Sequence, residues 1–336
     1  MFLNGIAFGV VQVVLAALVG SKHGSMAAGV VISAGAAGRL LAIQLDRLGV
    51  LRGIWPRARL LAVSTLAFIS LAAFAPWQLA AVAMSFIGCF SVLFSGLLMN
   101  ASSEHIHAGS AASMSGQALG MLIGGFAANF GTWTLVAVAS LLSLSLFSIP
   151  SLIHLTGREP DTKRDRPIRH GLFPFLLAVT SYGPLGLFST LVALEYGSSW
   201  VGPAFILYAI GSWVAARVAS RFDLGPAGSA FLAAIGTAVW MFGFSSLPLM
   251  LAARFVSGVL VFLAQGATLT RASRDGGSAG VASALAGLGI GAPLASLWCG
   301  VLADHSIQLM ASTASLATLL LAATVLSLQR RSRSAA

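Results

Sequence analysis

The chain has 336 residues, of which 57% are hydrophobic and only 8% are charged. A soluble globular domain carries roughly 25% charged residues, so this composition excludes an ordinary water-soluble protein. The formal net charge of +10 would favour nucleic-acid binding in a soluble protein. Here the basic residues stand between hydrophobic runs, a pattern typical of charges that fix orientation in a membrane.

Apolar runs long enough to cross a bilayer, about 20 residues each, follow one another along the chain. The first begins at Phe2 without a basic leader, so we expect a membrane span there and not a cleavable signal peptide. A count of ten or eleven spans stays open, because the breaks near Pro76, Gly131 and Pro248 are short. The predicted spans, about 12 in all, are 3–20, 26–45, 59–75, 77–99, 112–130, 132–153, 172–194, 200–220, 227–245, 247–268, 280–303 and 306–328.

The Lys and Arg residues predict how these spans are oriented. The links after even-numbered spans and the C-terminal tail hold nearly all the basic residues between spans, whereas the links after odd-numbered spans hold Lys22 alone. Cytoplasmic links carry the excess of Lys and Arg in membrane proteins. We therefore expect a multi-pass protein of the cell (inner or plasma) membrane with both termini in the cytoplasm.

One extended polar stretch, 155–171, divides the chain near its midpoint. Transporters built from two related halves have such an arrangement. The sequence therefore predicts an all-α integral membrane protein with an N-terminal six-helix bundle (1–154), a cytoplasmic linker (155–171), a C-terminal six-helix bundle (172–329) and a basic cytoplasmic tail (330–336).

Several short motifs occur in the two halves of the chain. The second span ends on Asp46-Arg47-Leu-Gly49, and the tenth contains Arg254 followed four residues later by Gly258. The fifth span carries Gly120, Gly124 and Gly125 on one helical face, and the eleventh carries Gly291-Ala-Pro293. Together with the span count and the midpoint linker, these motifs resemble those of the major facilitator superfamily.

This resemblance implies a secondary active transporter that works by alternating access. The form of transport that we expect from it is proton-coupled export of a small organic solute. It implies a gating role for Asp46, Arg47 and Gly49, and it places spans one, four, seven and ten around a central cavity. The polar residues of these spans that are candidates for solute binding are Gln12, Tyr182, Arg254 and Gln265.

Arg254 is the most informative single residue, since it is expected about two helical turns into the bilayer. An arginine inside a membrane is expensive and normally faces a cavity or a carboxylate. Glu195 and Asp304, at the same predicted level, are candidate partners and candidate groups for proton coupling. A structural ion pair and a role in transport both stay open for Arg254.

Metal and cofactor chemistry gain no support from the sequence. Cys89 and Cys299 lie in apolar runs without a partner motif. His105 and His107, with Glu104, supply too few ligands for a metal site. We expect no enzyme activity, no cofactor and no nucleic-acid partner, and a monomer in contact with membrane lipid, a small-molecule substrate and protons. The alternatives are a ten-span drug/metabolite-type carrier, a membrane protein without transport activity, and an integral membrane enzyme.

Overall fold

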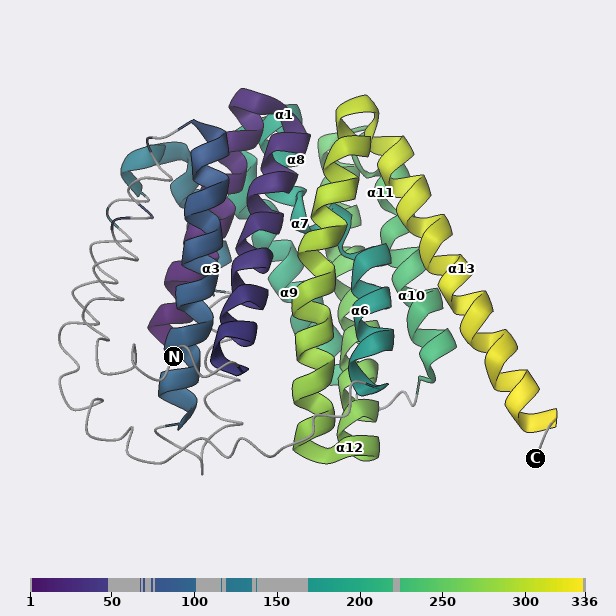
Figure 1. Cartoon of the computed structure of the whole chain (residues 1–336). Coiled ribbons are helices and arrows are strands. Elements are labelled where there is room, and N and C mark those ends of the chain that lie inside the picture. The colour runs from purple at the N-terminus through teal and green to yellow at the C-terminus, as the bar shows by residue number, and fades with distance from the viewer. Residues whose placement is uncertain are drawn as a thin grey trace. The chain divides into compact units, whose positions relative to one another are not determined.

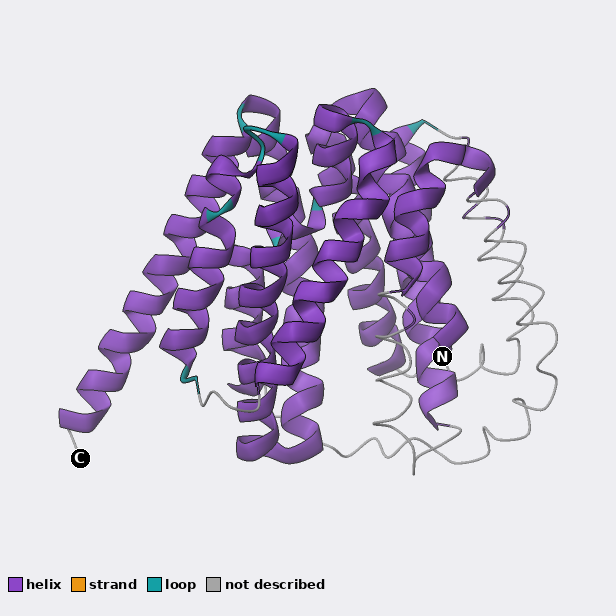
Figure 2. Cartoon of the chain, turned by 180° about the vertical axis from the view of Figure 1, so that it is seen from behind, coloured by secondary structure: helices purple, strands orange, loops and turns teal. Residues whose placement is uncertain are grey.

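The structure is a computed structural model, and it describes residues 2–47, 67, 69, 74, 76–100, 116, 119–134, 137, 169–219 and 224–334. Every regular element in these ranges is helical, which confirms the predicted all-α class (Figures 1 and 2). The longer helices are α1 (Phe2–Arg47), α3 (Trp77–Asn100), α6 (Arg169–Ser181), α8 (Phe188–Tyr196), α9 (Val201–Ala219), α10 (Pro226–Ala238), α12 (Leu247–His305) and α13 (Ile307–Ser334). The short ones are η4 (Ala128–Phe130), α7 (Gly183–Gly186), η6 (Ser198–Trp200) and α11 (Trp240–Gly243).

Helix α1 combines the first two predicted spans. Gly24 divides it, because its φ of 86° lies in the left-handed region, where glycine carries no Cβ penalty. The second limb packs closely on α3: a Cβ at Gly88 would collide with the backbone of Gly35. Small residues that face each other let membrane helices approach in this way.

Helix α12 likewise combines two predicted spans, the tenth and the eleventh. A Cβ at Gly280 would collide with the carbonyl oxygen of Ala272, although eight residues of straight helix would separate the two by about 12 Å. The ribbon therefore turns back between them, near the α12 label in Figure 1. Its two limbs, Leu247–Gly276 and Ser283–His305, are each apolar and long enough to cross a membrane.

The seventh predicted span, 172–194, is not one continuous helix. It is interrupted at Tyr182, between α6 and α7, and at Leu187, between α7 and α8. Pro184 lacks the N–H that a continuous helix would use in its backbone ladder, and it stands at the start of α7 instead. The sequence Gly-Pro at 183–184 is the local cause of the interruption.

Two compact units emerge from the contacts within the chain. One comprises Met1–Arg164 with Ser189–Pro203, and the other comprises Asp165–Phe188 with Ala204–Ala336. The first boundary falls inside the predicted linker 155–171. Ser189–Pro203 joins the first unit through contacts such as the hydrogen bond that the Thr190 hydroxyl donates to the carbonyl of Ala16, 2.8 Å long.

Within the described ranges, five segments are apolar and long enough to span a membrane: Gly9–Gly35, Pro226–Gly243, Leu247–Gly276, Ser283–His305 and Ile307–Arg331. Large apolar side chains lie on the outside of these helices; on α13, Leu316 and Leu320 are 59% and 60% exposed. A soluble monomer rarely exposes such continuous apolar surface, whereas lipid covers it in a membrane protein. The predicted count of 12 spans and the two six-helix bundles extend over residues outside the described ranges and stay predictions.

Candidate functional site

Arg254 lies in the first limb of α12 and is buried, with 1% of its surface exposed. Three aromatic rings surround its guanidinium group. The guanidinium carbon lies 3.7 Å from the ring centroid of Phe188 and 3.9 Å from that of Tyr208. The ring of Phe205 is 5.0 Å away. These distances place the cation against the negative faces of the rings, an attraction worth about 2 kcal/mol at a desolvated site.

The three rings are held by further aromatic contacts within the same unit. Phe188 packs on Phe205 and on Trp240, with ring centroids 5.6 and 5.5 Å apart. Tyr208 packs on Phe262 at 5.4 Å. Phe188 comes from α8, Phe205 and Tyr208 from α9, and Trp240 from α11. Phe188, Phe205 and Tyr208 thus form an aromatic cage around Arg254. Its residues lie far apart in the sequence, and its rings are supported by further aromatic contacts.

The guanidinium group lacks the carboxylate partner that the sequence led us to consider. Its Nε and Nη1 atoms are buried and have no hydrogen-bond partner, and among the described residues no carboxylate pairs with Arg254. Glu195 and Asp304 are both exposed. Near Glu195, at the end of α8, partial burial and then the charge of that carboxylate raise the pKa of Tyr196.

An unpaired cation in this position costs free energy. The effective penalty for burying an ion is several kcal/mol, and the attraction to the aromatic rings, about 2 kcal/mol in all, offsets it only in part. An anionic group that contacts Nε or Nη1 would recover the remainder. Arg254 therefore has two donor nitrogens that no residue in the described part of the chain accepts from.

The interrupted span lies against the second limb of α12. A Cβ at Gly183 would collide with the side chain of Cys299, and one at Gly186 with the hydroxyl of Ser296. The indole N–H of Trp298 donates to the carbonyl of Val179 at 2.9 Å, in the last turns of α6. These contacts fix the breaks at Tyr182 and Leu187 and thereby the position of Phe188 in the cage.

The other predicted solute-binding residues are distributed over both units. Tyr182 has a buried hydroxyl without a hydrogen-bond partner among the described residues. Gln265 lies eleven residues beyond Arg254, on the same face of α12 and about 16 Å along its axis. Gln12, half-buried in α1, belongs to the first unit.

The predicted glycines lie where helices approach closely. Gly120 and Gly124 face α1, where a Cβ would collide with the backbone of Ile6 and come within 3.0 Å of Val10. Gly125 faces Val201 and Gly202, at the start of α9. The three glycines therefore serve two different contacts within the first unit.

In the second unit, Gly258 faces Tyr208: a Cβ at Gly258 would lie 3.1 Å from the carbonyl oxygen of Tyr208. The absence of a side chain at Gly258 therefore lets α9 pack closely against α12, the helix that carries Arg254. Gly291 faces α6, where a Cβ at this position would lie 2.5 Å from the carbonyl oxygen of Phe175. Pro293 follows in the same limb of α12. The predicted gate residues Asp46 and Arg47 are the last two residues of α1, and their side chains lie outside the described part of the chain. Gly49 lies outside the described residues altogether.

No group of three potential metal ligands occurs among the described residues. Glu104, His105 and His107 lie outside them. Cys89 and Cys299 are buried thiols.

The sequence interpretation missed the aromatic cage. Phe205 and Tyr208, three residues apart, share one face of a helix, and Phe188 follows a Gly-Pro interruption in the seventh span. The spacing alone could not reveal that these residues meet Arg254, because aromatic residues three apart are usually ordinary packing.

No known family model matches the sequence, and no curated protein matches it in sequence. Solved structures match it over nearly the whole chain. The nucleoside transporter NupG matches with a TM-score of 0.70 at 13% identity, over 97% of this chain and 96% of that one. A bacterial homologue of the human lysosomal transporter Spinster matches with a TM-score of 0.69 at 15% identity, over 98% and 94%.

The human organic anion transporter MFSD10 matches with a TM-score of 0.59 at 18% identity, over 96% of each chain. All three are transporters. At sequence identities this low, the similarity shows a shared fold and nothing more. The resemblance drawn from the motifs is thereby confirmed at the level of the fold: this chain has the fold of the major-facilitator-type membrane transporters.

Proposed function

We propose that the chain is a secondary transporter that moves a small organic solute across a cell membrane by alternating access. The fold supports a transporter, and the interrupted seventh span supports a binding site beside it. Discontinuous helices line the substrate sites of many transporters, since unwound backbone is tolerated there only next to a cavity or within protein.

The observation that carries the proposal furthest is the unpaired guanidinium of Arg254, which supports a solute with an acidic group. A carboxylate or similar anion would supply an acceptor to this guanidinium, whose Nε and Nη1 atoms have no hydrogen-bond partner among the described residues. The surrounding rings of Phe188, Phe205 and Tyr208 would then contact the apolar part of the same solute. Buried ionisable residues inside membranes are rare and commonly mark solute or ion pathways.

The gate and the coupling residues belong to the proposal as well. Asp46, Arg47 and Gly49 are proposed to lock one end of the transport pathway, through charge pairing where the second span ends. Glu195 and Asp304 are proposed as proton-coupling groups, because they are acidic side chains at the ends of the seventh and eleventh predicted spans. Export, as opposed to uptake, stays a prediction from the resemblance.

The test is transport by the purified protein in lipid vesicles that contain a pH-sensitive dye. Pools of acidic, neutral and basic solutes are added separately, with counterflow of labelled solutes as a readout that needs no proton coupling. Arg254→Ala is compared with Arg217→Ala, a matched control in which an exposed arginine beside Trp213 is removed. Asp46→Asn tests the gate.

We expect flux with acidic solutes, at least tenfold weaker in Arg254→Ala because a buried charge partner is worth about 2–5 kcal/mol in binding. Arg217→Ala should behave like the original chain. Asp46→Asn should slow exchange while leaving the affinity for the solute unchanged. Equal flux in Arg254→Ala and in the original chain would overturn the assignment of the site. If none of the solutes in any pool gives counterflow, the transporter proposal is overturned.

A further inference from the structure

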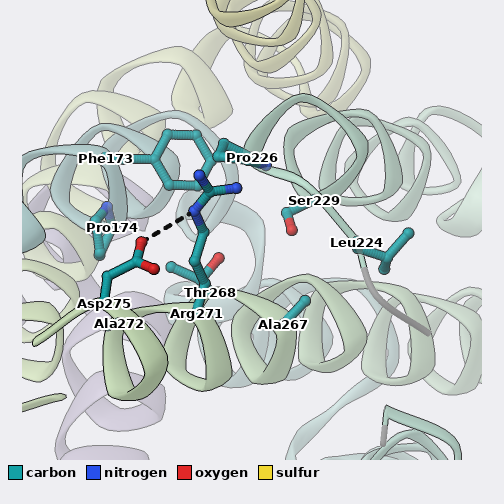
Figure 3. Close-up of a pocket in the computed structure, with 10 residues that line it drawn as sticks. All are labelled: Phe173, Pro174, Leu224, Pro226, Ser229, Ala267, Thr268, Arg271, Ala272 and Asp275. Carbon is teal, nitrogen blue, oxygen red and sulfur yellow. Dashed lines mark ion pairs between the residues drawn. The ribbon is translucent and has the colours of Figure 1, made fainter. Parts of the chain in front are cut away.

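A small cavity lies at one end of the second unit, away from Arg254 along α12. Its volume is about 150 Å³, and it opens between the first turns of α6 and α10 and the end of the first limb of α12. Phe173, Pro174 and Leu224 form apolar parts of its wall (Figure 3). A cavity of this size has room for about five water molecules at roughly 30 Å³ each.

A buried hydroxyl group in this cavity has no partner in the described part of the chain. Ser229 is 1% exposed, and its Oγ atom makes no hydrogen bond to any residue that the structure describes. Thr268, on the opposite wall, instead donates its hydroxyl to the carbonyl of Ala264 at 2.7 Å. Buried polar groups in proteins are nearly always hydrogen-bonded, so a lone hydroxyl that lines a cavity points to a bound group that completes it.

The beginning of α10 lies beside the same hydroxyl. Gly225, in extended conformation, precedes the helix, and no side chain caps it. The N–H of Ser229 makes the first helical bond, to the carbonyl of Gly225 at 2.9 Å. The N–H groups of Ala227 and Gly228 precede that bond, so they have no partner within the helix. Such N–H groups, with the positive end of the helix dipole, attract anions.

Arg271 adds a positive charge at the mouth of the cavity. Its Nε lies 3.4 Å from Oδ2 of Asp275, and about half of each side chain is exposed, at 53% and 51%. Figure 3 shows the carboxylate on one side of the guanidinium and the other two nitrogens directed away from it, toward Pro226. The carboxylate thus orients Arg271 and leaves its outer nitrogens available to an acceptor.

We propose that this cavity binds a phosphoryl group. A phosphoryl group has several acceptor oxygens, which match the Ser229 hydroxyl, the N–H groups that begin α10 and the outer nitrogens of Arg271. The volume fits a headgroup-sized anion and is well below the roughly 300–1,000 Å³ of pockets that enclose a whole organic ligand. The site is therefore separate from the one proposed for the transported solute.

The test measures binding and not transport, so its result is independent of the proposed transport function. The full-length protein in a maltoside detergent is unfolded by heat, followed by tryptophan fluorescence, with inorganic phosphate, dihexanoyl phosphatidate or dihexanoyl glycerol added. The glycerol lipid is the matched control without phosphate. The variants are Arg271→Gln and Ser229→Ala, with Arg274→Gln as the control for loss of an exposed arginine on the same helix.

We expect phosphatidate to raise the unfolding temperature and dihexanoyl glycerol to leave it unchanged. The apparent affinity should fall about tenfold in Arg271→Gln and in Ser229→Ala, since hydrogen bonds to a charged group are lost. It should stay the same in Arg274→Gln. Ser229→Ala should not lower the unfolding temperature without ligand, because the hydroxyl it removes is unpaired.

The two phosphate probes distinguish the source of the group. A shift with inorganic phosphate that depends on Arg271 and Ser229 supports free phosphate, and a shift with phosphatidate alone supports a lipid headgroup. The proposal is overturned if neither probe shifts the unfolding temperature, or if the shift is the same in both variants as in the original chain.

Discussion

The guanidinium carbon of Arg254 lies 3.7 Å from the ring centroid of Phe188, the residue that directly follows the second break in the seventh predicted span. The break and the buried cation thus belong to one arrangement. If α8 continued α6 without interruption, helix geometry would turn Phe188 to another direction, since each residue turns the helix by about 100°. The position of Phe188 in the cage depends on Gly183 and Pro184, five and four residues before it in the sequence.

Replacement of Arg254 by methionine should separate stability from function. A buried unpaired ion costs several kcal/mol and its aromatic contacts return about 2 kcal/mol. Arg254→Met should therefore leave the unfolding temperature unchanged or raise it, by the equivalent of about 1 kcal/mol or more, while solute-dependent counterflow is lost. Thermal unfolding in detergent and counterflow in vesicles measure the two effects. Strong destabilisation would contradict the idea that the guanidinium is unpaired.

Two glycines in one turn of α12 make a matched pair. A Cβ at Gly291 would lie 2.5 Å from the carbonyl oxygen of Phe175, whereas one at Gly289 would have nothing within 4 Å. We expect Gly291→Ala to destabilise the protein by about 1–3 kcal/mol through overpacking. Gly289→Ala should be neutral or stabilising by up to about 1 kcal/mol, since alanine favours helix. Equal unfolding temperatures would show that α6 does not approach α12 as closely as described.

The hydrogen bond from Thr190 to the carbonyl of Ala16 should be measurable. It is 2.8 Å long and buried, and it joins segments 174 residues apart. Thr190→Val keeps the shape of the side chain and removes the donor, so we expect a loss of roughly 0.5–1.5 kcal/mol in unfolding experiments. Thr324→Val is the control, because that hydroxyl bonds to Leu320 within its own exposed helix. A control variant that loses as much as Thr190→Val would contradict the assignment.

The predicted orientation can be tested by labelling with a membrane-impermeant maleimide. Arg274→Cys and Ser199→Cys each place a thiol at an exposed position, and the two native cysteines are buried. The distribution of Lys and Arg predicts that residue 199 is labelled in intact cells and residue 274 only after the membrane is opened. The reverse pattern would place the termini outside.

The helices of the second unit show how much of the fold could be predicted from the sequence. The apolar runs and their Gly and Pro breaks predicted α9, the second limb of α12 and the starts of α10, of the first limb of α12 and of α13 to within a few residues. The C-terminal ends were less accurate: α10 ends at Ala238 and not at 245, the first limb of α12 at Gly276 and not at 268, and α13 at Ser334 and not at 328. The break inside the seventh span was missed, although Gly183 and Pro184 stand in it, because the run 172–194 is apolar throughout.

The sequence by itself determined that this chain is apolar enough to lie in lipid, that it is helical and where several of the described helices begin. These properties follow from local features, since backbone groups must be satisfied within each span and charge is excluded from the bilayer core. It also identified Arg254 as an unusual residue. Only the tertiary structure decided what surrounds Arg254, because Phe188, Phe205 and Tyr208 reach it through packing between helices that no linear spacing encodes.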